Sequence, residues 1–319
     1  MQTILLIKTS SLGDVVHNLP VVEDIRRALG EAAIDWAVER SFAAIPVMHP
    51  AIRRVIPCEL RQWRRSWLAP VTRRAWRSFV AELRAEQYDC VIDTQGLLKS
   101  AIVARAARGR RVGMDWKSSR EPLRPFYDQV FSIPWTLHAV ERNRRLAALA
   151  LGYEVAGGPR YGISAEKSVA PWMPSGPYAV FLHGTSHPRK LWPESRWVDL
   201  GTRLALSGYS FVLPWGNRHE HERAQRLAAV LPSAVTAPRL SIEDVARMIA
   251  GARFVVGVDT GLTHLAAALA VAVVGIYGAT DPRATGIQAP GHAMNLGNVG
   301  RFPSCEEVVE ALGSFGIVS

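Results

Sequence analysis

The sequence predicts an α/β protein made of two doubly wound halves. Short apolar, β-branched runs alternate with helix-forming segments along the chain, which is the pattern of parallel strands joined by helices. The length of 319 residues suits two domains. Glycine and proline are concentrated in residues 152–177, and the alternation restarts after them. We therefore expect two Rossmann-like domains, 1–160 and 161–319, with ligand loops that face each other across a cleft.

The first half alternates strands and helices, with polar loops between them. The expected strands are 4–7, 34–38, 55–56, 88–93 and 110–114, and the expected helices are 15–29, 72–86, one that ends near 107, and 138–151. Pro20 should lie in the first turns of helix 15–29 or at a kink. Loops 8–14 and 94–100 follow two of these strands, and each contains glycine. Loop 8–14 should lie at the carboxyl edge of the sheet, where open α/β sheets bind ligands.

The second half repeats this pattern. The expected strands are 178–182, 210–213, 254–258 and 271–277, and the expected helices are 193–207, 219–230, 242–250, 262–269 and a closing helix at about 304–313. Polar loops follow the first two strands, at 183–190 and 214–217. These loops should also gather at the carboxyl edge of a parallel sheet.

The positive charge of the chain is concentrated in the first half. Residues 1–150 carry 24 Lys and Arg against 15 Asp and Glu, a net of +9, whereas residues 151–319 carry 14 against 13, a net of +1. A basic half indicates an anionic partner, such as nucleic acid, anionic lipid or an acidic substrate. General arginine enrichment of the genome is the alternative explanation.

Cysteine usage and hydropathy indicate a cytoplasmic protein. The three cysteines, Cys58, Cys90 and Cys305, have neither metal-site nor disulfide spacing, which fits a reducing compartment. The longest apolar run, 265–277, is shorter than the ~18 residues that a membrane-spanning helix needs. We therefore expect no membrane span, although the protein can still contact a membrane surface.

The strand, turn and helix of residues 254–269 form the most informative stretch of the sequence. Thr260 and Gly261 lie where backbone N–H groups and a helix N-terminus can bind a phosphate. Asp259 repels phosphate but suits the hydroxyls of a sugar. The combination indicates a nucleotide-sugar. A strand–helix corner in which Asp259 caps the helix is an equally weighted alternative.

Three other sites carry residues suited to sugar transfer. Asp14 follows a glycine at a loop-to-helix junction and can act as a general base on a hydroxyl, or simply cap the helix. Thr185, Ser186 and Lys190 follow a strand and suit a diphosphate, with Lys190 balancing the charge on a leaving group. Glu220 can hold ribose hydroxyls, although a solvated glutamate at a helix start is the simpler interpretation.

Several common catalytic motifs are missing from the sequence. It contains no Walker A motif, no GxGxxG, no GxSxG nucleophile elbow and no histidine-rich metal set. It also contains no Asp-X-Asp triplet that would hold a metal on a sugar diphosphate. We therefore expect no cofactor and no metal, with charge balanced by fixed donors and cations.

Motifs along essentially the whole chain resemble one known family. They are residues 8–20, 93–100, 113–116, 120–122, 138–142, 189–193, 213–216, 258–264 and 277–282. In this order they resemble the ADP-heptose glycosyltransferases of family 9. The run Asp-Thr-Gly-Leu-Thr-His at 259–264 marks the family, and segments 61–67, 113–116 and 120–122 favour its type I branch over type II.

The resemblance implies a GT-B fold, with the acceptor in the first domain and ADP-heptose in the second. It implies inverting transfer of L-glycero-D-manno-heptose to the first Kdo of Kdo₂–lipid A in the lipopolysaccharide core of Gram-negative bacteria. It also implies a cytoplasmic enzyme, peripheral on the anionic cytoplasmic face of the inner membrane, that binds no nucleic acid.

The resemblance also implies roles for individual residues. Asp14 matches the catalytic base, and Arg61, Arg64, Arg65, Lys99 and Arg120 match the acceptor-binding set. The residues that match the donor-binding set are Thr185, Ser186, Lys190, Glu220, Leu240, Asp259, Thr260, Gly261 and His264. Ser186 departs from the family, which is expected to have a second threonine there; the hydroxyl is kept and a methyl group is lost.

Three alternatives remain beside this prediction. A type II heptosyltransferase, or another GT-B enzyme such as an epimerase, would share the fold. A nucleic-acid-binding protein would explain the basic half and its tryptophans but not Asp14, Lys190 and Asp259. A non-catalytic module that binds a membrane surface would explain the charge alone.

Overall fold

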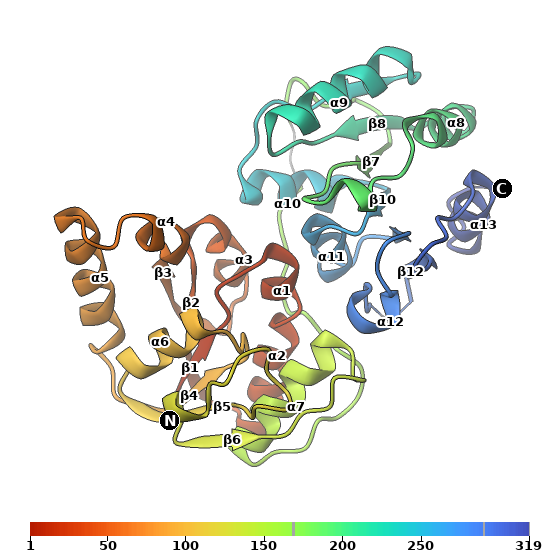
Figure 1. Ribbon diagram of the computed structural model, residues 1–319. Coiled ribbons are helices and arrows are strands. Elements are labelled where there is room, and N and C mark those ends of the chain that lie inside the picture. Colours follow the sequence, from red (N-terminus) through yellow and green to blue (C-terminus); the bar gives the residue numbers. More distant parts are fainter. Residues whose placement is uncertain (168–169, 290, 319) are drawn as a thin grey trace. The chain divides into compact units, whose positions relative to one another are not determined.

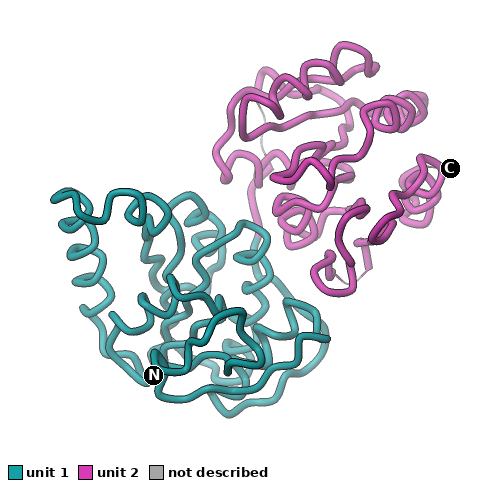
Figure 2. Tube along the Cα trace, in the orientation of Figure 1, with its two compact units in different colours: residues 1–163 teal, residues 164–319 magenta. Residues whose placement is uncertain are grey.

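The structure is a computed structural model that describes residues 1–167, 170–289 and 291–318. The chain divides into two compact units, Met1–Ile163 (unit 1) and Ser164–Ser319 (unit 2) (Figure 2). Each unit contains a six-stranded sheet in which every pair of neighbouring strands is parallel. The predicted α/β class with two doubly wound sheets is confirmed.

Unit 1 has the strand order β3-β2-β1-β4-β5-β6. Its strands are β1 (Gln2–Ile7), β2 (Ala32–Glu39), β3 (Ile52–Cys58), β4 (Tyr88–Asp93), β5 (Gly109–Met114) and β6 (Gln129–Phe131). Its helices are α1 (Leu12–Val16), α2 (Leu19–Leu29), α3 (Ala44–Val47), α4 (Leu60–Arg65), α5 (Pro70–Leu83), α6 (Leu98–Ala106) and α7 (Ala139–Leu151), with short 3₁₀ turns η1 (Arg40–Phe42) and η2 (Arg124–Phe126) (Figure 1).

The two faces of this sheet are covered by different helices. Leu5 and Ile7 of β1 pack in one buried cluster with residues of α4, α5 and α6. Because side chains alternate along a strand, Ile4 and Leu6 point to the other face, and both are fully buried. Helices α2 and α7 pack together on that second face.

The predicted single helix 15–29 is wrong, because the segment forms two helices. α1 ends at Val16 and α2 begins at Leu19, with Pro20 in the first turn of α2. Proline has no N–H to donate and is tolerated where a helix begins, so it favours a new start over continuation. The break leaves Asp14 on the short helix α1 at the carboxyl edge of the sheet.

Unit 2 repeats the topology, with the strand order β12-β11-β10-β7-β8-β9. Its strands are β7 (Tyr178–Leu182), β8 (Ser210–Leu213), β9 (Ala234–Thr236), β10 (Phe254–Val258), β11 (Val273–Tyr277) and β12 (Ala293–Gly297). Its helices are α8 (Glu194–Ala205), α9 (Arg218–Val230), α10 (Ile242–Gly251), α11 (Gly261–Ala268), α12 (Pro282–Thr285) and α13 (Cys305–Ser314), with the 3₁₀ turn η3 (Pro188–Lys190).

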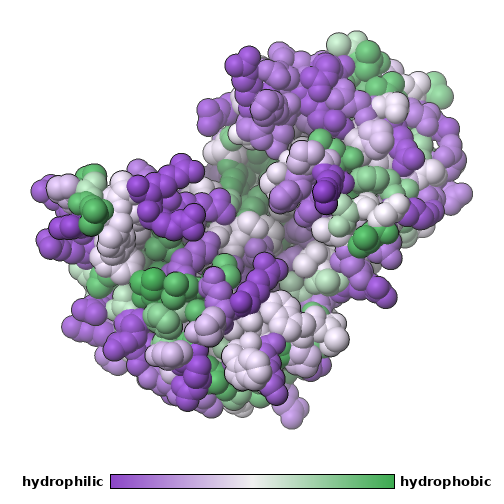
Figure 3. All heavy atoms as spheres, viewed as in Figure 1, coloured by the Kyte–Doolittle hydropathy of each residue, from purple (hydrophilic) through white to green (hydrophobic). Residues whose placement is uncertain are grey.

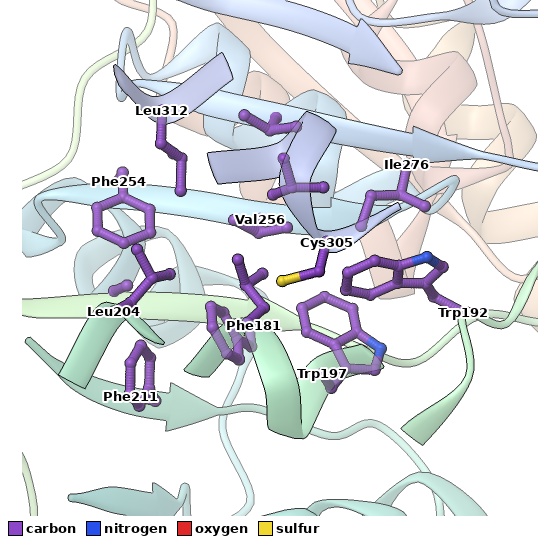
Figure 4. Close-up of a cluster of buried hydrophobic side chains, with 14 of the residues drawn as sticks. Phe181, Trp192, Trp197, Leu204, Phe211, Phe254, Val256, Ile276, Cys305 and Leu312 are labelled. Carbon is purple, nitrogen blue, oxygen red and sulfur yellow. The ribbon is translucent and has the colours of Figure 1, made fainter. Parts of the chain in front are cut away.

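Aromatic side chains dominate one face of the second sheet. Phe181 packs between the rings of Trp197 and Phe211, with ring centroids 4.9 and 4.6 Å away. Figure 4 shows this cluster, to which α13 contributes Cys305 and Leu312. The closing helix is therefore part of the core of unit 2, because its apolar face is buried against α8 and the sheet.

Three strands, β6, β9 and β12, were not predicted from the sequence. Each lies at the edge of its sheet and pairs with a single neighbour. β6 and β9 have three residues each, too few to show a clear hydrophobic pattern. Within the described residues, no helix is long and apolar enough to cross a membrane.

Candidate functional site

In both sheets, the direction in which the chain adds successive strands reverses between the two central strands. In unit 1 these strands are β1 and β4, and in unit 2 they are β7 and β10. The chain winds away from the centre in opposite directions there, so the loops that follow the two strands diverge and leave a crevice at the carboxyl edge. The predicted site residues lie in and around these loops in each unit.

Unit 1 has a pocket of about 310 Å³ at this position. The loop after β1, helix α1 and the loop after β4 supply one part of its wall, and α7 with the loop after β5 supplies another. The lining residues are Lys8, Ser10, Ser11, Asp14, Arg61, Thr94, Gln95, Gly96, Leu97, Met114, Ser118, Ser119, Arg120, Trp135, Ala139, Arg142 and Asn143. Four of them are cations and one is a carboxylate.

Asp14 is the carboxylate of this pocket. It is the third residue of α1, and its Oδ2 accepts hydrogen bonds from the backbone N (2.7 Å) and Oγ (2.9 Å) of Ser11, the N-cap residue. The alternative in which Asp14 is the helix N-cap is wrong, because Ser11 holds that position and Asp14 is its capping-box partner at the third helical residue. Its Oδ1 accepts no hydrogen bond within the described chain, so one oxygen of the carboxylate can accept a proton from a ligand.

The loops around Asp14 are fixed by contacts with each other. The side-chain oxygen of Gln95 accepts hydrogen bonds from the backbone N–H groups of Thr9 and Ser10, both at 3.0 Å. Lys99, a predicted acceptor residue on α6, donates to Ser10 Oγ at 2.5 Å. Burial, followed by the nearby Arg61, lowers the pKa of Lys99. These contacts join the loop after β1 to the loop after β4 and place Asp14.

The pocket contains two cations that were not predicted as site residues, Lys8 and Arg142. Lys8 is 5% exposed and donates to the backbone O of Thr94 (2.6 Å) and to Asn143 Oδ1 (3.2 Å). Burial lowers the pKa of Lys8 to about 8. It lies within the motif 8–20, but a lysine directly after a buried strand gives no local signal of its role.

Arg142 enters the pocket from α7. Its guanidinium lies 3.6 Å from the centroid of the Trp135 ring and donates to the backbone O of Ser118 at 2.5 Å. Burial, followed by repulsion from Arg120, lowers the pKa of Arg142 to about 10. Neither Lys8 nor Arg142 has a carboxylate within ion-pair distance among the described residues, so the pocket offers positive charge to an anionic ligand.

The predicted arginines divide into two groups. Arg61 and Arg120 line the pocket. Arg64 and Arg65 are exposed on α4 and do not line it. Together with Lys99, which touches Ser10, the structure thus brings three of the five predicted acceptor residues to the neighbourhood of Asp14.

In unit 2, the loops after β7, β10 and β11 meet at Asp259. Lys190 Nζ lies 2.7 Å from Asp259 Oδ2, and Thr280 Oγ1 donates to the same oxygen at 2.5 Å. Thr185 Oγ1 donates to the backbone O of Asp259 at 3.1 Å. The ion pair neutralises Asp259, which removes the repulsion that its carboxylate would exert on a phosphate. Thr280 was missed as a site residue, although it lies in the motif 277–282.

The predicted phosphate-binding turn lies beside this ion pair. Thr260 is the N-cap of α11 and Gly261 is the first helical residue, so the N–H groups of the first turn point to the carboxyl edge of the sheet. His264 lies one turn further along and is 5% exposed. The alternative in which Asp259 itself is the helix cap is wrong, since Thr260 holds that position.

Glu220 lies in the first turn of α9, where its Oε2 accepts a hydrogen bond from Gly216 N at 2.7 Å. A Cβ on Gly184 would come within 2.8 Å of the Glu220 carboxyl carbon, so glycine is needed for this close approach. Ser186 lies in the same polar loop as Gly184. Leu240 directly precedes Ser241, the N-cap of α10, and is half-buried. All of these positions follow the carboxyl ends of β7, β8 and β9.

No group of three or more His, Cys, Asp or Glu side chains suited to a metal ion occurs among the residues that the structure describes. The three cysteines are buried and unpaired. The prediction that the reaction needs no metal stays a prediction.

Comparison with known proteins gives matches over most of the chain. A family model described as "Glycosyltransferase family 9 (heptosyltransferase)" matches residues 76–309. The lipopolysaccharide heptosyltransferase 1 of Pseudomonas aeruginosa is 48% identical over 288 residues, which are 89% of this chain and 80% of the relative. The solved structure of Escherichia coli heptosyltransferase WaaC with ADP has a TM-score of 0.90 at 41% identity, and the match covers 98% of this chain and 100% of that one.

A second solved structure holds WaaC with ADP-2-deoxy-2-fluoro heptose. It has a TM-score of 0.84 at 41% identity, and the match covers 98% of both chains.

Proposed function

Because this chain belongs to glycosyltransferase family 9, the heptosyltransferases, we propose that it moves L-glycero-D-manno-heptose from ADP-heptose to the first Kdo of Kdo₂–lipid A. The chain is a glycosyltransferase of lipopolysaccharide core biosynthesis with a fold of the GT-B type. The observation that carries the finer proposal is the pocket of unit 1, in which the single carboxylate of Asp14 lies among four cations.

In this proposal the pocket of unit 1 holds the acceptor. Kdo is an acidic sugar, and cations without carboxylate partners favour its anionic groups. Asp14 takes the proton of the attacking hydroxyl on its Oδ1, while Ser11 holds Oδ2. The hydroxyl oxygen forms a bond to the anomeric carbon as the bond to ADP breaks, so the configuration at that carbon inverts.

Unit 2 is proposed to hold the donor. Thr185, Ser186, Thr260 and Gly261 offer hydroxyl and backbone N–H donors to the diphosphate. Lys190 has three N–H groups, so it can contact a phosphate oxygen and Asp259 at the same time. Its charge then stabilises the departing ADP. The WaaC complex with a fluorinated ADP-heptose supports this assignment of the donor.

The remaining donor residues have more distant roles in the proposal. Asp259 contacts heptose hydroxyls through its Oδ1, His264 lies beside the phosphates, Glu220 holds ribose hydroxyls and Leu240 lines the adenine site. Arg61, Lys99 and Arg120 bind the acceptor at the pocket, and Arg64 and Arg65 bind its more distant anionic groups. No metal or other cofactor takes part.

The reaction is proposed to occur on the cytoplasmic face of the inner membrane, where the lipid anchor of the acceptor holds its sugars. The net charge of +9 on residues 1–150 favours this anionic surface. The type II alternative is not favoured, because the Pseudomonas aeruginosa relative, of which the match covers 80%, is a heptosyltransferase 1. Family membership also removes the grounds for a nucleic-acid-binding protein.

Measurement of ADP release tests this function. With ADP-heptose, we expect release only when Kdo₂–lipid A is present, and we expect it to persist in EDTA. If ADP-heptose releases ADP in the presence of a heptosylated acceptor but not in the presence of Kdo₂–lipid A, the chain would be assigned to the type II reaction. Loss of all activity in EDTA would overturn the metal-independent mechanism while leaving the substrates in place.

A further inference from the structure

We propose that the α4–α5 hairpin of unit 1 (residues 60–77) is a docking surface for an anionic lipid bilayer. The inference rests on the proposed function in one respect, since a lipid-anchored acceptor brings the enzyme to a membrane. The surface itself is identified by exposure and charge alone.

The turn between α4 and α5 exposes large apolar side chains. Trp67, Leu68 and Val71 are 50%, 77% and 73% exposed, although they lie within five consecutive residues. Single exposed apolar residues are common on soluble proteins, but three at one protruding turn indicate an interaction surface. Side chains of this kind enter the boundary between lipid headgroups and acyl chains.

Arginines without carboxylate partners flank this apolar turn in the sequence. They are Arg61, Arg64, Arg65, Arg73, Arg74 and Arg77, and all six are exposed. No carboxylate of the described chain lies within ion-pair distance of any of them, and Glu82 is the sole acidic residue between positions 60 and 83. A bilayer that contains anionic lipid supplies the missing negative charge beside an apolar phase.

The hairpin is rigid beneath its exposed turn. The Trp76 ring lies 5.8 Å from Trp63 and 5.7 Å from Trp67, and Trp63 lies 5.5 Å from Phe79. Trp63 and Phe79 belong to the buried cluster on the sheet. The turn therefore projects from a fixed base, so it can enter a bilayer without unfolding.

Helix α6 of unit 1 also exposes apolar side chains. It covers the same face of the sheet as α5. Leu98, Ile102 and Arg105 are all exposed and, at spacings of four and three, lie along one side of α6. Figure 3 shows hydrophobic and hydrophilic spheres side by side over this part of unit 1. The docking surface adjoins the proposed acceptor site at Arg61, which belongs to α4 and lines the pocket.

Nucleic acid fits this surface less well than lipid does. Phosphates would satisfy the arginines and a base can stack on Trp67, but nucleic acid offers no apolar phase for Leu68 and Val71. The hairpin exposes two aliphatic side chains between the arginines of α4 and α5, and this combination favours a bilayer.

Binding to vesicles tests the surface without either substrate. We expect the protein to bind vesicles with about 30 mol% phosphatidylglycerol and not vesicles of phosphatidylcholine alone. Two variants, Leu68→Ser/Val71→Ser and Arg73→Glu/Arg74→Glu, should each need about tenfold more anionic lipid for half-maximal binding. None of these four residues belongs to the proposed acceptor or donor sites.

Matched controls alter exposed residues elsewhere in the chain. Leu206→Ser/Val230→Ser removes apolar exposure from unit 2, and Arg145→Glu/Arg253→Glu makes the same change in net charge. Both controls should bind vesicles as the unaltered protein does. Equal losses in the test and control variants, or no loss in the test variants, would overturn the proposal. Tighter binding to a DNA duplex than to the anionic vesicles, lost in the same test variants, would overturn it in favour of nucleic acid.

Quenching by brominated lipid provides a measurement that does not depend on these variants. Tryptophan fluorescence should fall when the protein binds brominated anionic vesicles, and Trp67→Phe should reduce the quenching. Unchanged quenching in Trp67→Phe would contradict insertion of the turn.

Activity separates this inference from the proposed function. On a deacylated, water-soluble acceptor, both test variants should turn over as the unaltered protein does. On acceptor embedded in vesicles, their KM should rise about tenfold. If the unaltered protein transfers heptose to neither acceptor, the proposed function fails whatever the vesicles show. If it uses both and the variants lose nothing on vesicles, the docking surface alone fails.

Discussion

Units 1 and 2 have the same strand order, but the arginines on their surface helices differ in whether they form ion pairs with carboxylates. In unit 2, five of the six arginines of α8, α9 and α10 are paired with carboxylates: Arg203 with Asp199 and Glu306, Arg218 with Glu222, Arg223 and Arg226 with Glu194, and Arg247 with Glu243. The sixth, Arg196, donates to the backbone O of Pro303. In unit 1, the six arginines of α4 and α5 have no such partners in the described structure. The same topology therefore carries two different surfaces. The arginines on the surface of unit 2 are neutralised within the chain, whereas those of α4 and α5 in unit 1 require anions from outside it.

The two crevices differ in the same way. In unit 2, the ammonium of Lys190 is already paired with Asp259. In unit 1, Lys8 is buried and Arg142 is half-buried, and their contacts are neutral oxygens and an aromatic ring. A desolvated cation with no carboxylate in ion-pair contact raises the free energy of the empty pocket, so an anionic ligand gains affinity by supplying that contact. We therefore infer that the unit 1 pocket favours a ligand with net negative charge, and that the unit 2 crevice suits a ligand that carries both phosphate and hydroxyl groups.

The largest expected effect comes from Asp14, the single carboxylate of the unit 1 pocket. Asp14→Asn should lower kcat by about 10²–10⁴, because a general base is lost, while ADP-heptose still binds unit 2. Rates of ADP release and calorimetric binding of the donor would measure the two effects. Turnover close to that of the unaltered enzyme would restrict Asp14 to its hydrogen bonds with Ser11.

The Lys190–Asp259 ion pair should give the next largest effect. Lys190→Ala should lower kcat/KM by an amount equivalent to about 2–4 kcal/mol of transition-state stabilisation, since it removes the cation next to the departing ADP. Asp259→Ala should weaken binding of ADP-heptose more than binding of ADP, because the carboxylate is assigned to the sugar. Calorimetry with both ligands measures this difference. Equal losses for ADP and ADP-heptose would place Asp259 away from the heptose.

The predicted arginines should separate by their distance from the pocket. Arg120→Glu, at the pocket, and Arg64→Glu/Arg65→Glu, outside it, should each raise the acceptor KM at least about tenfold, or roughly 1.4 kcal/mol, with an unchanged donor KM. For a deacylated acceptor that lacks the lipid A phosphates, Arg120→Glu should keep its effect and the double variant should lose most of it. The same loss with both acceptors would mean that Arg64 and Arg65 also bind the first sugar.

The smallest expected effect concerns pH. Lys8 has its pKa lowered to about 8 by burial, and Asp14, Asp93 and Arg142 are the charged groups that influence it. The ammonium is charged below this pKa and neutral above it, so acceptor KM should rise by up to about tenfold between pH 7 and pH 9. Lys8→Met should have a high acceptor KM already at pH 7, with little further rise. An unchanged profile in this variant would exclude Lys8 as the titrating group.

The fold could be predicted from the sequence where strands are buried on both faces. The runs 4–7, 178–182 and 254–258 are apolar because helices cover both sides of the central strands. β6 and β9 could not be predicted because three residues are too few to show a hydrophobic pattern, and β12 could not because all five of its residues are only partly buried. Pro20 indicated a helix start or a kink within 15–29, and it lies in the first turn of α2. The separate helix α1 was not predicted, because the apolar periodicity continues through Pro20.

The site was predictable where a residue stands in a recognisable turn. Asp14, Asp259, Thr260 and Gly261 directly follow the central strands or begin a helix, and their positions could be read locally. Arg142 enters its pocket from a helix about 130 residues after Asp14, so only the folded sheet brings the two together. The pairing of Lys190 with Asp259 likewise depends on the order of β7 and β10 in the sheet.

The dependence of the two KM values on salt tests the division between the units most directly. KM for acceptor and for ADP-heptose would be measured with the unaltered enzyme as sodium chloride is raised from about 0.05 to 0.4 M. The account predicts a steep rise in acceptor KM, because unpaired and partly exposed cations of unit 1 bind several anionic groups. It predicts little change in donor KM, because unit 2 binds the diphosphate largely through N–H and hydroxyl donors. A donor KM that rises as steeply as the acceptor KM, or an acceptor KM that does not change, would contradict the account.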